Sequence, residues 1–107
     1  MLFRSRATTE AIARKYGNAL VSSIVQFVPE GQIDPPTGHM QMPGTISLTE
    51  ATYEALLTDI CRSLRQNGFR KIFLLGDSGG NQDGMRNVAD VLNREWKDTR
   101  VLYLPEY

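Results

Sequence analysis

Cysteine and histidine are nearly absent from this sequence, which has one of each among its 107 residues: Cys61 and His39. A lone cysteine cannot close an internal disulfide or supply a CxxC motif, and its place among apolar helix positions predicts a buried thiol. Twelve basic and twelve acidic side chains cancel, whereas nucleic-acid-binding domains normally carry a basic surplus. No apolar run reaches the ~18 residues of a membrane span. We therefore expect neither a nucleic acid nor a membrane as a partner.

Length and composition are those of a small globular domain. A chain of 107 residues, 41% of them hydrophobic, can bury a working core as one domain. A helix is predicted directly after residues 1–6, and a strand ends close to the last residue. We therefore expect residues 1–107 to form a single partial domain, with residues 1–6 as a truncated or non-native start. These six residues do not resemble a signal peptide, and the sequence indicates no localisation.

Helical and strand patterns alternate along the chain. The patterns predict a helix over 8–16, a strand over 19–28, a loop over 29–46, a helix over 47–67, a strand over 71–76, a helix over 82–96 and a strand over 100–105. Ser47 and Glu50 have the spacing of a capping box that would open the second helix. Such alternation is typical of parallel sheets with right-handed crossovers. We predict a three-layer α/β fold with a mainly parallel sheet and helices on both faces.

Each of the two long helices is expected to bury one apolar stripe, because its apolar residues recur at helical spacing. The expected core positions are Tyr53, Leu56, Leu57, Ile60 and Leu64 in the first helix, and Met85, Val88, Ala89, Leu92 and Trp96 in the second.

Two segments follow the carboxyl ends of predicted strands, where open α/β sheets bind their ligands. One is the loop over 29–46, which carries His39, and the other is the turn over 76–81, which carries Ser78. A loop of this length inside a compact domain is usually functional or disordered. Both segments are expected at the same edge, where His39 and Ser78 would share a cleft. The alternative for His39 is a loop histidine bonded to the backbone, and we interpret Glu30 and Asp34 as solvated loop carboxylates rather than catalytic groups.

The turn "GDSGG", residues 76–80, permits more than one interpretation. It fits the G-x-S-x-G pattern of a hydrolase nucleophile placed between a strand and a helix. A serine needs a base to become a good nucleophile, however, and no histidine follows Ser78. The same residues also suit a tight structural connection, in which Asp77 or Ser78 caps the next helix.

Longer segments around this turn resemble one known family. They are "ATTEAIARKYGNALV", then "GHMQMPGTISL" leading into a long helix, then "LRQNGFRKIFLL", and finally the glycine turn followed by Asn81. Together they resemble the middle of the creatininase (creatinine amidohydrolase) family. The resemblance implies a three-layer α/β enzyme that uses divalent metal ions, zinc or manganese, to hydrolyse a non-peptide C–N bond of a small linear or cyclic amide. Family members commonly assemble, so a homo-oligomer is also expected.

The resemblance also implies roles for single residues. Members of the family show a Gly-His-Gly-Gly-Asn turn, so Ser78 stands where that turn carries a metal-binding histidine. Asp77 is then the candidate metal ligand of this chain, and Ser78 a pocket residue. Gly79 and Gly80 would let the backbone approach metal or substrate, Asn81 would orient a ligand or cap the helix, and the segment with His39 resembles the substrate-side loop.

The family's other ligands lie in segments that this sequence does not contain, among them one of the Glu-x-His-Gly-Pro-His type. The 107 residues alone are therefore expected to be inactive. Because Ser78 replaces a ligand, an alternative remains open: a non-catalytic α/β module with a degenerate metal site that binds a small molecule or another subunit.

Overall fold

The computed structural model describes residues 14–15, 20–21, 27–75 and 79–104. In chain order the elements are the 3₁₀ helix η2 (Gly38–Gln41), α2 (Glu50–Gln66), β1 (Lys71–Leu75), α3 (Gly79–Glu95) and β2 (Arg100–Leu104). Arg14 and Lys15 are helical, in agreement with the helix predicted over 8–16, whose other residues lie outside the described ranges. The described ends of the strand predicted over 19–28, residues 20–21 and 27–28, are not in a strand, so that prediction is wrong there.

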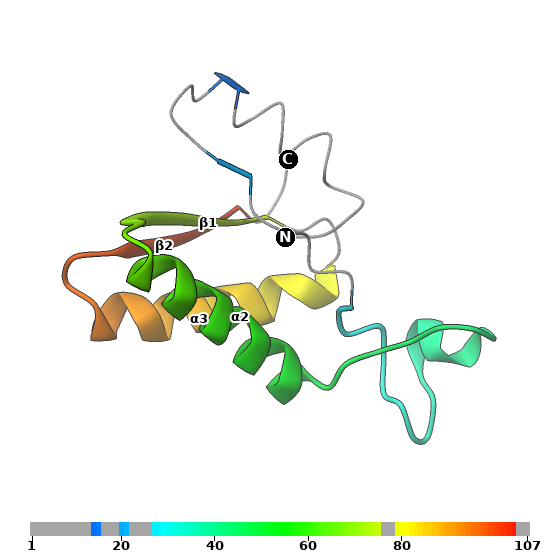
Figure 1. Cartoon of the computed structure of the whole chain (residues 1–107). Helices are drawn as coiled ribbons and strands as arrows, with labels where there is room; N and C mark the ends of the chain where they lie inside the picture. Colours follow the sequence, from blue (N-terminus) through cyan, green and yellow to red (C-terminus); the bar gives the residue numbers. More distant parts are fainter. Residues whose placement is uncertain (1–13, 16–19, 22–26, 76–78, 105–107) are drawn as a thin grey trace.

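The two strands form a parallel pair. Lys71 lies opposite Arg100 and Leu75 opposite Leu104, and α3 is the crossover between them. Both helices lie on the same side of the sheet in Figure 1, and their N-termini point toward the edge at which β1 and β2 end. The predicted α/β class and parallel pairing are thus confirmed, and the described helices form the layer on one face.

Helix α2 begins one turn later than the sequence predicts, and its cap is a different residue. The N-cap is Thr49, whose hydroxyl accepts a hydrogen bond from the Thr52 amide at 3.2 Å. The predicted box of Ser47 and Glu50 is therefore wrong, because Ser47 lies upstream of the cap and bonds to the preceding loop. The helix ends before Gly68, whose φ of 102° suits glycine.

The core lies between the sheet and the two helices. Alternation along the strands turns Ile72, Leu74 and Val101 toward the helices. The predicted helix stripes are largely buried, and full burial of each large apolar side chain contributes roughly 1.5–3 kcal/mol. The core cluster is Tyr53, Leu57, Cys61, Ile72, Leu74, Met85, Val88, Ala89, Leu92, Trp96 and Val101, with Ile60 and Leu64 packed against it. Leu56 is an exception, because it lies at the solvent side of the stripe and remains exposed.

Cys61 is buried in this core, as predicted. Its thiol is free, and burial raises its pKa to about 11. A thiol with so high a pKa remains protonated at neutral pH and is a poor nucleophile.

A glycine brings the two helices into close contact. A Cβ added to Gly84 of α3 would lie 2.7 and 2.8 Å from Cδ2 and Cε2 of Tyr53 on α2. The ring therefore packs directly over the Gly84 backbone, and Tyr53 is fully buried. Burial, with the Glu50 carboxylate as a smaller cause, raises the pKa of Tyr53 to about 12.

Polar contacts stabilise the region where α2 and α3 end and β2 begins. The Arg65 guanidinium donates to both carboxylate oxygens of Asp98 at 3.1 and 3.3 Å and lies 4.9 Å from the centre of the Trp96 ring. Asn93 bonds twice to the Val101 backbone, each time at 2.8 Å. The Arg65 contacts join α2 to the segment between α3 and β2, and the Asn93 bonds join α3 to β2. Among the described residues, no helix is long and apolar enough to cross a membrane.

Candidate functional site

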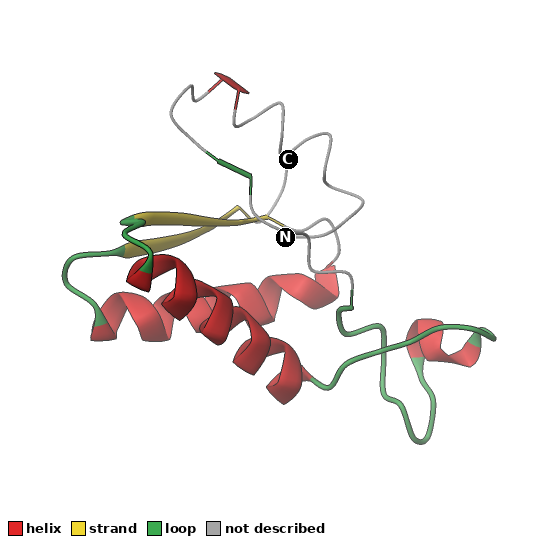
Figure 2. Cartoon of the chain, in the orientation of Figure 1, coloured by secondary structure: helices red, strands yellow, loops and turns green. Residues whose placement is uncertain are grey.

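Residues 27–49, called the arm below, lead into α2. Val28 and Leu48 at its base pack against the core, and the part of the arm between them extends away from the helices and sheet (Figure 1). Apart from η2 the arm consists of loops and turns, shown in green in Figure 2, as the sequence predicts for residues 29–46. Its segments are joined by hydrogen bonds: the Leu48 amide donates to the Val28 carbonyl at 3.4 Å and the His39 amide to the Glu30 carbonyl at 3.0 Å. The arm is thus an ordered, closed loop.

Two glycines allow the arm to close. A Cβ on Gly31 would collide with the Thr37 carbonyl oxygen, and one on Gly38 would lie 2.9 Å from the Glu30 carbonyl oxygen. Their φ angles are 141° and 55°, values that side chains disfavour. The two glycines flank Glu30 and His39 on the inner sides of the loop, and they let these two residues meet.

Ser47 joins the first part of the arm to the last part. Its hydroxyl oxygen accepts a hydrogen bond from the Glu30 amide at 2.8 Å and lies 3.1 Å from the Gly31 carbonyl oxygen, to which it can donate. The side chain is buried. Ser47 therefore positions Glu30, which explains why it does not cap α2.

His39 and Glu30 face each other in the closed loop. The His39 Nδ1 atom lies 3.5 Å from the Glu30 Oε2 atom, and the two side chains are 74% and 30% exposed. Glu30 is thus a loop carboxylate, as interpreted from the sequence, but it is only partly exposed and lies beside a histidine. The sequence contains one indication of this pairing, because Gly31 follows Glu30 and Gly38 precedes His39. The two glycines could not be assigned to this role without knowing that the loop closes on itself.

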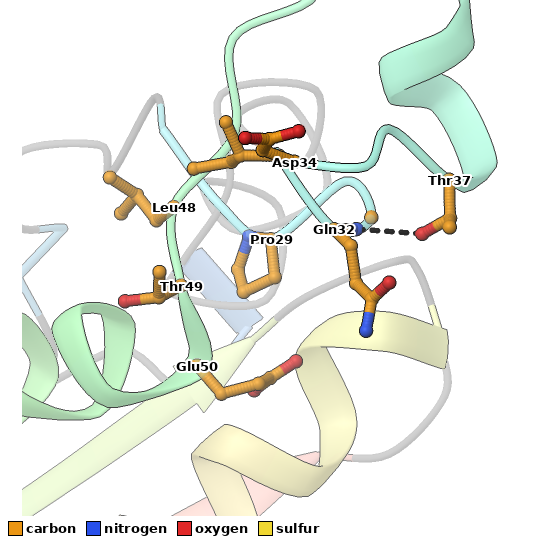
Figure 3. Close-up of a pocket in the computed structure, with 9 residues that line it drawn as sticks. Pro29, Gln32, Asp34, Thr37, Leu48, Thr49 and Glu50 are labelled. Carbon is orange, nitrogen blue, oxygen red and sulfur yellow. Dashed lines mark hydrogen bonds between the residues drawn. The ribbon is translucent and has the colours of Figure 1, made fainter.

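The described part of the chain also contains an open hollow of about 670 Å³ between the arm and the start of α2. Figure 3 shows two carboxylates, Asp34 and Glu50, on different walls of this hollow. Its lining is Pro29, Gly31, Gln32, Ile33, Asp34, Thr37, Leu48, Thr49 and Glu50. Burial, followed by the nearby carboxylates of Glu54 and Asp83, raises the pKa of Glu50. The hollow combines apolar walls with hydrogen-bonding groups, and it is open to solvent.

The glycine turn is described only from Gly79 onward, and Asp77 and Ser78 lie outside the described residues. Gly79, Gly80 and Asn81 are the first three residues of α3. The predicted helix start at residue 82 is thus wrong by about one turn. Glycine lowers the stability of a helix, but this cost is smaller than the stabilisation that the helix gains by packing its downstream apolar stripe, so the helix extends to Gly79. Asn81 lies inside the helix and is not its N-cap.

The structure does not bring His39 to the strand edge within the described residues. Figure 1 shows η2, which holds His39, on the arm and well apart from the end of β1. Because Ser78 is not described, a cleft shared with Ser78 stays a prediction. Within the described ranges, no three His, Cys, Asp or Glu side chains gather closely enough to hold a metal ion.

Comparisons with known proteins agree on one family. The family model described as creatinine amidohydrolase matches residues 5–106. Among solved structures, a creatininase mutant complexed with creatine has a TM-score of 0.70 and 27% sequence identity, and the match covers 94% of this chain and 41% of that chain. None of the curated proteins compared with the chain matches it. The family model spans nearly the whole chain and the fold agrees with it, so the chain belongs to the creatininase family.

Proposed function

We propose that the protein is an amidohydrolase that cleaves the C–N bond of a small linear or cyclic amide, with creatinine as the first compound to test. The observation that carries this proposal is the family match over residues 5–106. The similarity to a creatininase complexed with creatine supports it. Since the chain spans 41% of that structure, we propose the activity for the longest reading frame that contains these 107 residues.

We further propose that this activity depends on zinc or manganese. In hydrolysis a divalent metal polarises the carbonyl group and activates a water molecule. The described residues do not form such a centre by themselves. Its ligands would come from Asp77, which lies outside the described residues, and from polypeptide beyond this sequence. The contribution of the described residues is the lining of the hollow and the ordered arm.

One sequence feature supports the second candidate, a non-catalytic binding module. Ser78 occupies the place of a metal-binding histidine in the family's turn, and a neutral hydroxyl is a weaker metal ligand than imidazole. A protein of this kind would retain the α/β fold and bind a small amide in the hollow without cleaving it.

The decisive experiment offers creatinine and a panel of small amides to the protein of the longest reading frame and measures product formation. We expect hydrolysis of at least one amide. Binding of an amide without any turnover would overturn the proposal in favour of the non-catalytic module.

Ser78→Ala separates the metal-dependent mechanism from a serine hydrolase mechanism. If Ser78 only lines the pocket, we expect activity to fall by less than roughly 10-fold, the effect of one uncharged hydrogen bond. A serine nucleophile predicts a loss of about 10⁶-fold. It also predicts labelling of Ser78 by a fluorophosphonate probe, and we expect no such labelling.

A further inference from the structure

We propose that the arm of one copy of the chain binds to the basic end of a second copy. The basic end is the exposed surface where the two helices end and the two strands begin, and it consists of Phe69, Arg70, Lys71, Lys97 and Arg100. The homo-oligomer that the sequence leads us to expect would then be joined through two different surfaces of each copy. This inference does not depend on the proposed hydrolysis.

The first support for the proposal is the uneven distribution of charge along the chain. Between Lys15 and Arg62 the sequence contains no lysine or arginine, and this stretch includes the whole arm and most of α2. Its carboxylates are Glu30, Asp34, Glu50, Glu54 and Asp59. Residues 62–71, by contrast, contain no carboxylate, and their cations are Arg62, Arg65, Arg70 and Lys71. The arm is therefore acidic, and the surface that follows α2 is basic.

The arm and the basic end lie at opposite ends of the molecule. The arm leads into the start of α2, whereas Phe69, Arg70 and Lys71 follow the end of that helix. Figure 1 shows the arm beyond the helix starts and the connections that follow α2 and α3 at the other end. Since α2 has 17 residues, it spans about 25 Å. The two surfaces therefore do not meet within one copy, but two copies can bring them together.

The second support is the positive charge of the basic end. Within the described part of the chain, its cations form no ion pair, because the nearby Asp98 carboxylate is paired with Arg65. Arg70 and Arg100 donate to backbone carbonyl groups, each at 3.0 Å. Lys71 lies directly opposite Arg100 in the strand pair, and like charges in opposite positions destabilise a sheet. Carboxylates from a partner would reduce this repulsion.

The third support is the composition of the two surfaces. The arm exposes Ile33, Met42 and Ile46, and the basic end exposes Phe69 among its cations. Methionine, aromatic side chains and arginine are enriched in interfaces between proteins. The arm also has about as many residues as one side of a standard interface, roughly 20–30. Each surface thus combines apolar contact area with charge, and the two charges have opposite sign.

A second copy is the partner that satisfies both surfaces. An unrelated acidic partner would cover the basic end and leave the arm exposed, and an unrelated basic partner would do the reverse. In a contact between copies, each chain offers its arm to one neighbour and its basic end to another. Such head-to-tail contacts give a ring when the rotation closes and a filament when it does not.

Charge reversal on each surface tests the contact in the protein of the longest reading frame. The arm variant combines Glu30→Lys with Asp34→Lys, and the basic-end variant combines Lys71→Glu with Lys97→Glu. Each should raise the Kd of self-association roughly 10-fold or more, because attraction across the contact is lost or reversed. In a mixture, the unchanged arm of the second variant meets the unchanged basic end of the first. The mixture should therefore form heterodimers at concentrations where neither variant associates alone, as measured by sedimentation velocity.

Matched controls lie on the exposed side of α3, outside both surfaces. Asp90→Lys should leave Kd unchanged, and Met42→Ser in the arm should weaken association, whereas Val91→Ser, at a similarly exposed apolar residue of α3, should not. Raising the salt concentration should weaken association of the wild type, because exposed charges are then screened. A monomeric wild type, association that the charge reversals leave unchanged, or a mixture without heterodimers would each overturn the proposal. Heterodimers in the mixture also show that both variants are folded.

Discussion

The body formed by α2, β1, α3 and β2 and the arm of residues 27–49 differ in what holds them together. The body has a continuous apolar core between sheet and helices. The arm packs only Val28 and Leu48, at its base, against that core, and it leaves four large apolar side chains exposed, Phe27, Ile33, Met42 and Ile46. The arm is closed by backbone hydrogen bonds and one buried serine, and the close approaches at Gly31 and Gly38 leave no room for a side chain.

This difference in what holds the two regions together suggests two roles: the body provides the stability of the fold, and the arm sets the positions of a few polar side chains. Burial of apolar area is the main favourable term in folding, so the body determines whether the chain folds. Hydrogen bonds contribute less net free energy but have strict geometry, so the arm determines where a few polar groups lie. If this comparison is correct, changes in the body should alter global stability, and changes in the arm should alter local order.

The largest expected effect comes from a cavity in the body. Leu57 is 1% exposed within the core cluster, and Leu57→Ala should lower the free energy of unfolding by about 2–5 kcal/mol. Urea denaturation followed by circular dichroism measures this. The matched control is Leu56→Ala on the same helix, where the side chain is 36% exposed. A control loss as large as that of Leu57→Ala would contradict the assigned core.

The next effect tests the contact between the two helices. Gly84→Ala places a methyl group less than 3 Å from the Tyr53 ring, and overpacking of this kind costs about 1–3 kcal/mol. The intrinsic preference for alanine over glycine in a helix, roughly 1 kcal/mol, acts in the opposite direction. We expect a net loss in urea denaturation. In a Tyr53→Leu background the same substitution should cost less, and an equal cost would show that the ring is not the obstacle.

An intermediate effect, confined to the arm, is expected for Gly31→Ala. The added Cβ would meet the Thr37 carbonyl oxygen, so the loop must open. Amide hydrogen exchange at Thr37 and His39 should accelerate by at least ~10-fold, about 1.4 kcal/mol of local protection, while exchange in α2 and α3 changes little. Gly44→Ala is the control, because its φ is also positive but no neighbouring atom lies within 4 Å. Equal acceleration throughout the body would contradict the independence of the two regions.

The smallest expected effect concerns a surface contact of the body. The hydrogen bond from Arg65 lowers the pKa of Asp98 below its ordinary 3.8. Because the folded-state pKa is the lower one, the stabilisation is present above the unfolded value and disappears as pH falls through the folded value. Tm of the wild type should therefore exceed that of Asp98→Asn slightly at pH 7, and the two should converge below about pH 3.8. A constant difference down to pH 2 would contradict the ionic origin.

The body could be predicted from the sequence because its elements follow periodic patterns. The buried positions from Met85 in α3 to Trp96, directly after the helix, match the apolar spacing, and the family was identified correctly from four short segments. The start of α3 at Gly79 was missed because local propensity favours a turn, whereas helix extension depends on the packing of later residues.

The arm could not be predicted in the same way. Its closure depends on contacts between residues that are not adjacent in the sequence, such as Glu30 with His39 and Glu30 with Ser47, and no sequence period indicates these contacts. Ser47 illustrates the difficulty: its spacing to Glu50 fits a capping box, but its hydroxyl bonds to the arm and Thr49 takes the cap. When a polar side chain has two possible hydrogen-bond partners, the three-dimensional fold determines which of them it contacts.

The measurement that tests the central claim most directly is metal removal from the protein of the longest reading frame, followed by stepwise return of zinc or manganese. Amide hydrolysis and bound metal would be determined on the same samples. If the protein is a metal-dependent amidohydrolase, activity should vanish with the metal and return in proportion to the metal bound. Full activity in metal-free protein would contradict the account.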